Sequence, residues 1–176
     1  MGKHTNRWLY KESKYSQQIS DLTLYGKSVY EIKNNLKGMG LYGGHTIMSH
    51  CGVPIDGLKH RLVGENAEAF ESTSYQSYDD CINSIAYGLS MTWDTEVIPW
   101  LTDKRGTKFL TINCELPDNI IGYGVCSNDL DTLIYCHTQC IVLKRVTKNK
   151  WGFVIKTAFP TYKSINQVMR FEKMLK

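Results

Sequence analysis

Two histidines lie close together in a short segment that glycines bound on both sides. The segment runs Gly43-Gly-His-Thr-Ile-Met-Ser-His-Cys-Gly52 and contains His45 and His50. Glycines let a backbone approach a substrate closely, and imidazole, with an unperturbed pKa of about 6.5, exchanges protons near neutral pH. His50 would lie near the end of a short helix, where the helix dipole favours its protonated form. The segment predicts acid–base chemistry, although one histidine could equally cap or pack a helix.

Three further side chains could complete a site for a phosphate ester. Arg61 lies on the next expected helix, and its guanidinium fork suits a phosphate. Thr157 and Phe159 would share one face near the end of the last expected strand, where a hydroxyl beside a ring could bond and stack a base. Cleaving RNA without a metal needs a base for the 2′-hydroxyl proton, an acid for the leaving oxygen and donors for the phosphate. These residue types can supply all three.

Charge is divided unevenly along the chain, although the net charge of the 176 residues is only +4. Residues 1–40 hold seven Lys and Arg against three acids, residues 41–143 hold five against thirteen, and residues 144–176 hold nine against one. A basic surface can bind a polyanion because neutralised phosphates release counterions. The distribution fits nucleic-acid binding, but it also fits a solvated face. With 42% hydrophobic and 22% charged residues, the composition excludes a disordered chain.

Six cysteines make disulfides arithmetically possible, and one pair of them suggests a metal site. Cys136 and Cys140 flank His137, but no second pair at the usual spacing completes four ligands. In one alternating strand, residues 136 and 140 would share a face, as core cysteines do. We therefore favour a core role over zinc and expect neither a metal nor another cofactor.

Helices are expected in the first half of the chain. Residues 1–40 predict a lead-in of one or two helices that ends at a run of glycines. A short helix is expected over residues 45–50, Pro54 with Asp56 opens another, and Ser77 is the expected N-cap of a longer one. The apolar residues behind these spacings are Ile19, Leu22, Val29, Ile32 and Leu36, then Leu58, Leu62 and Val63, then Ile82, Ile85, Ala86, Leu89 and Trp93.

Beyond Pro99 the sequence favours strands. Segments rich in β-branched and aromatic residues predict strands over residues 109–116, 120–126, 132–145 and 151–159, with a hairpin turn at 147–150. Pro160 is expected to end the last strand, before a final basic helix. Helices followed by an antiparallel sheet predict an α+β fold, with residues 41–176 as one globular unit after the lead-in. The apolar residues of the final helix are Ile165, Val168, Met169 and Met174.

Several of these segments occur in an order that resembles a known family. The order is Gly-Gly-His-Thr-x-x-x-His-x-Gly at 43–52, Leu-x-x-Arg-Leu at 58–62, a Ser/Thr and aromatic segment at 72–78, and Thr-Ala-aromatic-Pro at 157–160. It resembles the RNase A-like C-terminal toxin domains of bacterial contact-dependent growth inhibition proteins, or CdiA-CT domains, over roughly residues 41–162. The resemblance implies the two-lobed fold of the ribonuclease A superfamily and an RNA endonuclease that needs neither disulfides nor metal.

The resemblance also implies roles for individual residues. His50 would be the catalytic histidine, Arg61 would contact the scissile phosphate, and Thr157 would belong to the active site. The family usually has a Tyr two residues after this Thr, whereas this chain has Phe159, so a hydroxyl is missing and the ring can only stack. The group that supplies the second proton is therefore left open. The candidates are His45 and Tyr75.

A partner and a location follow from the same resemblance. The substrate would be RNA, with transfer RNA as one option, and a cognate immunity protein would block the site, with the acidic centre of the chain as part of its surface. Such domains are the tails of larger exported proteins and act in the cytoplasm of the target cell. Accordingly, no segment approaches the roughly 20 apolar residues of a membrane span, and residues 1–10 lack the apolar stretch of a signal peptide.

Other functions remain open at this point. A non-catalytic RNA-binding module would use the basic ends and the aromatic residues without cleavage. A metal-binding module would be built on Cys136, His137 and Cys140. A toxin nuclease of the EndoU type also uses histidines without a metal, but the Lys and the Ser/Thr-x-Tyr ending that it needs are not found.

Overall fold

The computed structural model describes residues 28–43, 45–63, 69–103, 105–147 and 149–162. The helices of this part of the chain are α2 (Val29–Asn35), η1 (Leu41–Gly43), α3 (His45–His50), α4 (Ile55–Val63), α5 (Tyr78–Thr92), the π-helical turn η2 (Trp93–Val97) and α6 (Ile98–Thr102). The strands are β1 (Glu71–Ser74), β2 (Phe109–Glu115), β3 (Gly122–Cys126), β4 (Asp129–Cys136), β5 (Thr138–Arg145) and β6 (Phe153–Thr161).

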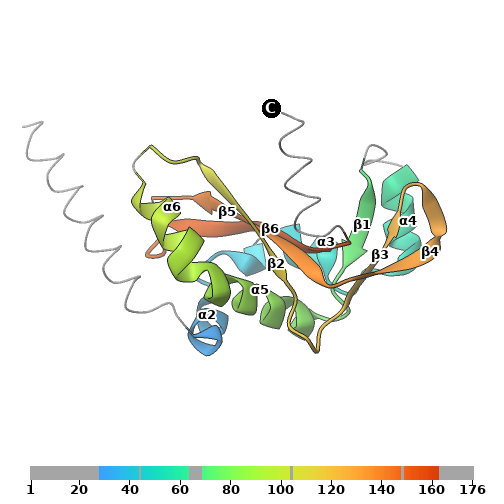
Figure 1. The fold of residues 1–176 in the computed structure, drawn as a ribbon, viewed down its shortest axis with the longest axis horizontal. Helices are drawn as coiled ribbons and strands as arrows, with labels where there is room; N and C mark the ends of the chain where they lie inside the picture. The colour runs from blue at the N-terminus through green and yellow to red at the C-terminus, as the bar shows by residue number, and fades with distance from the viewer. Residues whose placement is uncertain (1–27, 44, 64–68, 104, 148, 163–176) are drawn as a thin grey trace, which may run out of the picture.

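The strands form two antiparallel sheets, ordered β1-β3-β4 and β2-β5-β6. Helix α4 packs on β1 and β3, whereas α5 packs on β2 and β5, so each sheet has its own helical cover (Figure 1). Strand β6 also contacts β1 and β3. The two lobes therefore meet along β6, and the prediction of an α+β fold with two lobes is confirmed.

Most of the core lies between α5 and the sheet β2-β5-β6. A Cβ added at Gly88 of α5 would lie 2.7 Å from the Cys114 sulfur and 2.8 Å from Cδ1 of Ile141, so the helix rests directly on the sheet. Trp93 is buried at the end of this helix, edge-on to Trp151 with ring centroids 6.4 Å apart. The second core cluster is small and lies between α4 and the other sheet. Its buried members are Val53, Leu58, Leu62 and Val125.

The helix predictions are largely confirmed. The expected helix over residues 45–50 is α3, the helix after Pro54 is α4, and Ser77 caps α5 by accepting a hydrogen bond from the Asp80 amide at 3.0 Å. Of the predicted lead-in, Val29–Asn35 form α2 and residues 36–40 form turns. Residues 1–27 of the lead-in and the expected final helix lie outside the described residues.

One predicted strand is two separate strands, and one strand was not predicted. The segment 132–145 is not one strand: β4 ends at Cys136, and β5 begins at Thr138 in the other sheet, so the chain crosses between the lobes at His137. The supposition that Cys136 and Cys140 share a strand face fails for the same reason. Strand β1 was not foreseen, because its sequence Glu-Ser-Thr-Ser has no apolar alternation.

Pro160 does not end the last strand, as had been expected. It lies within β6 opposite Gln139, at the edge of the β2-β5-β6 sheet, where a residue without an N–H is tolerated. Its carbonyl accepts a hydrogen bond from the Thr73 hydroxyl of β1. A Cβ at Gly122 of β3 would lie 2.4 Å from the Pro160 ring, so the missing side chain at Gly122 lets the two sheets approach here.

None of the helices in the described part of the chain combines the length and the hydropathy that a membrane span requires.

A buried polar chain joins the start of α5 to β5. The Tyr75 hydroxyl donates to Oε1 of Gln139 at 3.0 Å, and Nε2 of Gln139 donates to the Ser84 carbonyl at 2.7 Å. Tyr75 and Gln139 are both fully buried. Because water cannot replace a lost partner there, each bond of this chain contributes to stability.

We predict that Tyr75→Phe destabilises the protein by about 1–3 kcal/mol, since it leaves Oε1 of Gln139 buried and unbonded. Urea denaturation followed by circular dichroism measures this change. The matched control is Tyr30→Phe, because Tyr30 is 75% exposed and its hydroxyl should contribute less than about 0.5 kcal/mol. Equal stability of the two variants would contradict the prediction.

Candidate active site

Helix α3 is fixed between the two sheets by its own backbone and one buried side chain. The buried hydroxyl of Thr46 accepts a hydrogen bond from the Ala158 amide of β6 at 2.8 Å. At the other end, the His50 carbonyl accepts from the Tyr75 amide at 2.8 Å, and the Gly52 amide donates to the Tyr75 carbonyl at 2.9 Å. Gly52 has a φ of +62°, a conformation that glycine adopts without strain. The position of His50 is therefore set from both lobes.

The His50 ring has a defined orientation. Its Nδ1 lies 3.2 Å from the Thr73 carbonyl oxygen of β1. Since a carbonyl only accepts, Nδ1 must carry a proton, and in the neutral ring the lone pair is on Nε2. The ring centroid lies 5.2 Å from that of Phe159 and 5.4 Å from that of His45. A nitrogen prepared to accept a proton thus lies next to a second imidazole.

The pKa of His50 is lowered to about 4: burial is the main cause, the Thr73 hydrogen bond partly opposes it, and the positive charges of His45 and Arg61 also lower it. The expectation that the end of α3 favours the cation was wrong. The reason is that burial, the largest effect on this pKa, penalises the charged form of the ring. His50 is consequently neutral at pH 7, as a general base must be.

Arg61 lies in the last turn of α4 and faces α3. Its Nη1 donates to the Ser49 carbonyl at 2.5 Å. Leu58 and Leu62 bury one face of α4 against the β1-β3-β4 sheet, and Arg61, half-buried beside them, reaches the neighbouring helix α3. A guanidinium has five donors, so this contact leaves others for a phosphate. The expectation that Arg61 turns back toward the histidines agrees with this placement.

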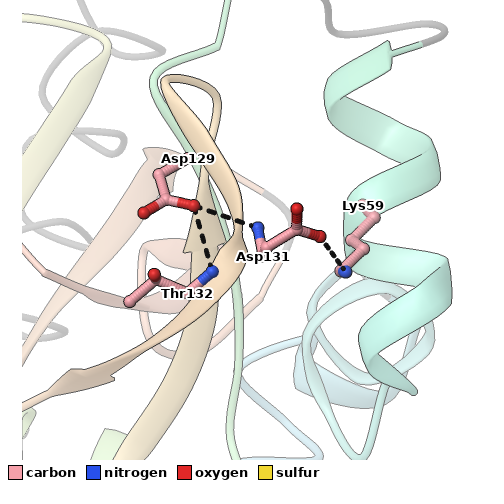
Figure 2. A network of polar contacts seen from close by, with 4 residues as sticks. All are labelled: Lys59, Asp129, Asp131 and Thr132. Atoms are coloured by element: carbon pink, nitrogen blue, oxygen red, sulfur yellow. Dashed lines mark hydrogen bonds and ion pairs between the residues drawn. The ribbon is translucent and has the colours of Figure 1, made fainter.

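Helix α4 is also tied to the far strand of its sheet. Lys59 forms an ion pair with Asp131 of β4, with 3.2 Å between Nζ and Oδ1 (Figure 2). Asp129 orders the same turn by accepting from the amides of Asp131 and Thr132. Asp131 is almost fully exposed, so the pair contributes no more than about 1 kcal/mol. The ion pair restricts the position of α4 at Lys59, two residues before Arg61.

Thr157 and Phe159 lie on one face of β6, as expected from strand alternation. The Thr157 hydroxyl oxygen is buried and has no hydrogen-bond partner in the described part of the chain. The strand is irregular beside it, where the register shifts between Val142 and Leu143. A buried hydroxyl without a partner is destabilising, and such groups recur at functional sites. Phe159 brings this face of β6 to His50.

Tyr75 does not reach the site. Its backbone bonds to that of His50, but its side chain points into the core, where burial raises the pKa of Tyr75 well above its ordinary value. The hydroxyl is held by Gln139. A group closed off from solvent in this way cannot exchange a proton with a substrate, so Tyr75 is withdrawn as a candidate for the second proton.

Cys136 and Cys140 belong to the core. Cys136 is fully buried and Cys140 is 7% exposed, at the adjoining ends of two strands, and burial raises the pKa of the Cys136 thiol. None of the six cysteines forms a disulfide. Within the described ranges, no three His, Cys, Asp or Glu side chains are grouped as a metal site would require.

Two residues of the site were missed in the sequence. Thr73 contributes only its backbone carbonyl, for which residue type gives no signal. Ser49 contributes a hydroxyl that lies 3.2 Å from Nδ1 of His45. The spacing of four residues within the expected helix 45–50 could have revealed this contact, since such side chains are neighbours on a helix.

Comparison with known proteins adds a family and a fold. A family model described as "Bacterial CdiA-CT RNAse A domain" matches residues 44–160. One chain of the crystal structure of the CdiA-CT/CdiI complex from Y. kristensenii 33638 aligns with a TM-score of 0.59 and 19% identity, over 67% of this chain and 99% of that one. At this identity the alignment shows a shared fold. No curated protein matches the chain.

The low pKa of His50 predicts a loss of stability in acid. The folded protein binds a proton here near pH 4, whereas an unfolded chain does so near pH 6.5. Between these values the unfolded state holds more protons, so stability falls as the pH decreases. We expect the wild type to lose about 2 kcal/mol more than His50→Gln when the pH changes from 7 to about 4.5.

Urea denaturation of both proteins at the two pH values tests this. The matched control is His60→Gln, because His60 is exposed on α4 and should follow the wild type. Equal acid sensitivity of the wild type and His50→Gln would show that burial of His50 does not control its titration.

Proposed function

Since the chain belongs to the family of bacterial CdiA-CT RNase A domains, matched over residues 44–160, we propose that it is a metal-independent toxin ribonuclease with His50 as its general base. One observation carries the mechanism: the ring of His50 is kept neutral by burial, its Nδ1 is bonded to the Thr73 carbonyl, and its Nε2 is left to accept a proton. Metal-free RNA cleavage begins with such a proton acceptor for the ribose 2′-hydroxyl.

The remaining residues are given roles by their positions. Nε2 of His50 takes the 2′-hydroxyl proton, and the 2′ oxygen attacks phosphorus as the bond to the 5′ oxygen breaks. Arg61, at the same end of α3, donates to the phosphate oxygens as charge develops on them. Thr157 bonds the nucleotide, and Phe159 stacks on a base. The product ends in a 2′,3′-cyclic phosphate.

His45 is proposed as the acid for the leaving 5′ oxygen. It is exposed, and its ring lies edge-on to that of His50 with centroids 5.4 Å apart. Tyr75 is buried in the core, and Phe159 has no hydroxyl to give. Of the candidates to donate this proton, His45 is thus the one that lies beside His50.

A partner and a route are also proposed. The similar solved structure is described as a CdiA-CT/CdiI complex, and we propose that this chain likewise has a cognate immunity protein that blocks its site. The acidic segment 41–143 is a candidate part of that interface. We further propose that the domain is delivered as the C-terminal part of an exported protein, with residues 41–176 as its folded unit, and cuts RNA, such as transfer RNA, in the target-cell cytoplasm.

The first test concerns the role of His50 and the independence of cleavage from metal ions. We expect the wild type to cut total cellular RNA in EDTA, and His50→Ala to lose about 10²- to 10⁴-fold in rate while still binding RNA. A denaturing gel measures cleavage, and filter binding measures affinity. His60→Ala is the matched histidine control and should cut as the wild type does. Activity that disappears in EDTA, or an active His50→Ala, would refute the mechanism.

The second test concerns the acid. His45→Ala should reduce kcat by about 10²-fold with little effect on KM, because only the departure of the 5′ oxygen lacks its proton. Phe159→Tyr restores the hydroxyl that related domains usually carry, and we expect it to recover part of the rate when combined with His45→Ala. Steady-state cleavage of a short fluorescent RNA measures both. An unchanged kcat in His45→Ala would assign the acid elsewhere.

A further inference from the structure

Ser49 lies where three groups of the proposed site meet. Its hydroxyl oxygen is 3.2 Å from Nδ1 of His45, its carbonyl accepts from Arg61, and the next residue is His50. A serine within a helix often turns its hydroxyl back to the carbonyl four residues earlier. Here the hydroxyl instead contacts the side chain four residues earlier, so it is available to act on an imidazole.

We propose that Ser49 is a positioning residue that keeps a proton on Nδ1 of His45 and so makes Nε2 the atom that gives its proton to the leaving group. This inference rests on the proposed function. A serine hydroxyl can accept or donate, but an acid that releases the proton of Nε2 retains the one on Nδ1. A hydroxyl that accepts from Nδ1 therefore suits the ring both before and after proton transfer.

In the proposed arrangement, Nδ1 of each histidine donates a hydrogen bond to an oxygen. Thr73 accepts from Nδ1 of His50 through its carbonyl, and Ser49 accepts from Nδ1 of His45 through its hydroxyl. Both rings then exchange protons only at Nε2. Control of the tautomer by a partner on the other ring nitrogen is a general device for histidine.

The protons balance over the reaction. His45 begins as the imidazolium and passes its Nε2 proton to the 5′ oxygen, which leaves phosphorus with the electrons of the broken bond. His50 begins neutral and gains the 2′-hydroxyl proton at Nε2, while the 2′ oxygen forms the new bond to phosphorus. One ring loses a proton as the other gains one, and each Nδ1 keeps its proton, hydrogen-bonded to the Ser49 hydroxyl or the Thr73 carbonyl.

The hydroxyl of Ser49 can be removed without removing the other contacts that hold this part of α3. Arg61 bonds to the backbone of Ser49, and α3 is anchored to β6 through Thr46. Ser49→Ala therefore removes the contact with His45 and leaves these two interactions in place. Ser49→Thr keeps the hydroxyl. Met48→Ala is the matched control on the same helix, because Met48 is 86% exposed.

Nuclear magnetic resonance of the histidine rings tests the proposal directly. Long-range proton–nitrogen spectra, recorded where the rings are neutral, distinguish a proton on Nδ1 from one on Nε2. We expect the proton of neutral His45 to be on Nδ1 in the wild type, Met48→Ala and Ser49→Thr. In Ser49→Ala we expect the tautomer with the proton on Nε2 to increase. In kinetics, Ser49→Ala should reduce kcat about tenfold with KM within about twofold, and Ser49→Thr should restore it.

The outcomes that would overturn the inference are separate from those that would overturn the function. A His45 proton on Nε2 in the wild type, or a tautomer unchanged in Ser49→Ala, would refute the role of Ser49 even if His45→Ala is inactive. A fully active His45→Ala would instead refute His45 as the acid, and the spectra would still decide whether Ser49 sets the tautomer.

Discussion

The attachment of α3 to both sheets is the constraint on which the rest of the site depends. Thr46 bonds to β6, and the His50 carbonyl bonds to the amide that follows β1. The helix has six residues, too few to be stable alone, so tertiary bonds must hold it. Because the same bonds place His50 at the junction of the lobes, a change in the packing of β1 against β6 would move His50 relative to Phe159.

Burial and charge act on His50 in the same direction. Desolvation is the largest effect on its pKa, the positive charges of His45 and Arg61 add to it, and the Thr73 hydrogen bond only partly offsets them. A phosphate bound between these groups would bring negative charge beside His50 and raise its pKa toward the range where a base is effective. The low pKa of His50 in the free protein thus fits a proposed base whose pKa rises when substrate binds. Arg61 would lower this pKa in the free protein and bind the phosphate in the complex.

The sequence revealed features that depend on local chemistry and missed those that depend on distant partners. Ser77 as an N-cap, α3 between its glycines and the side chains of His50 and Arg61 all follow from residue type and spacing. Strand β1 does not, because Thr73 and Ser74 use their hydroxyls on Pro160 and Val53, far away in the chain. The crossing at His137 interrupts a continuous strand-like run, and the inward turn of Tyr75 depends on Gln139. Neither has a local signal.

Phe159 leaves the proposed site without a hydroxyl at this position of β6. In place of a hydroxyl on β6, the chain has a ring that packs on His50, and the nearby Thr157 hydroxyl is left without a partner. In the proposed mechanism the second imidazole is that of His45, which lies beside His50 on α3. Moving the acid from strand to helix would place base, acid and the Ser49 contact on one element, so that a single anchored helix sets their separation. The distance between His45 and His50 would then depend on α3 more than on the register of β6, where the bulge already disturbs regular pairing.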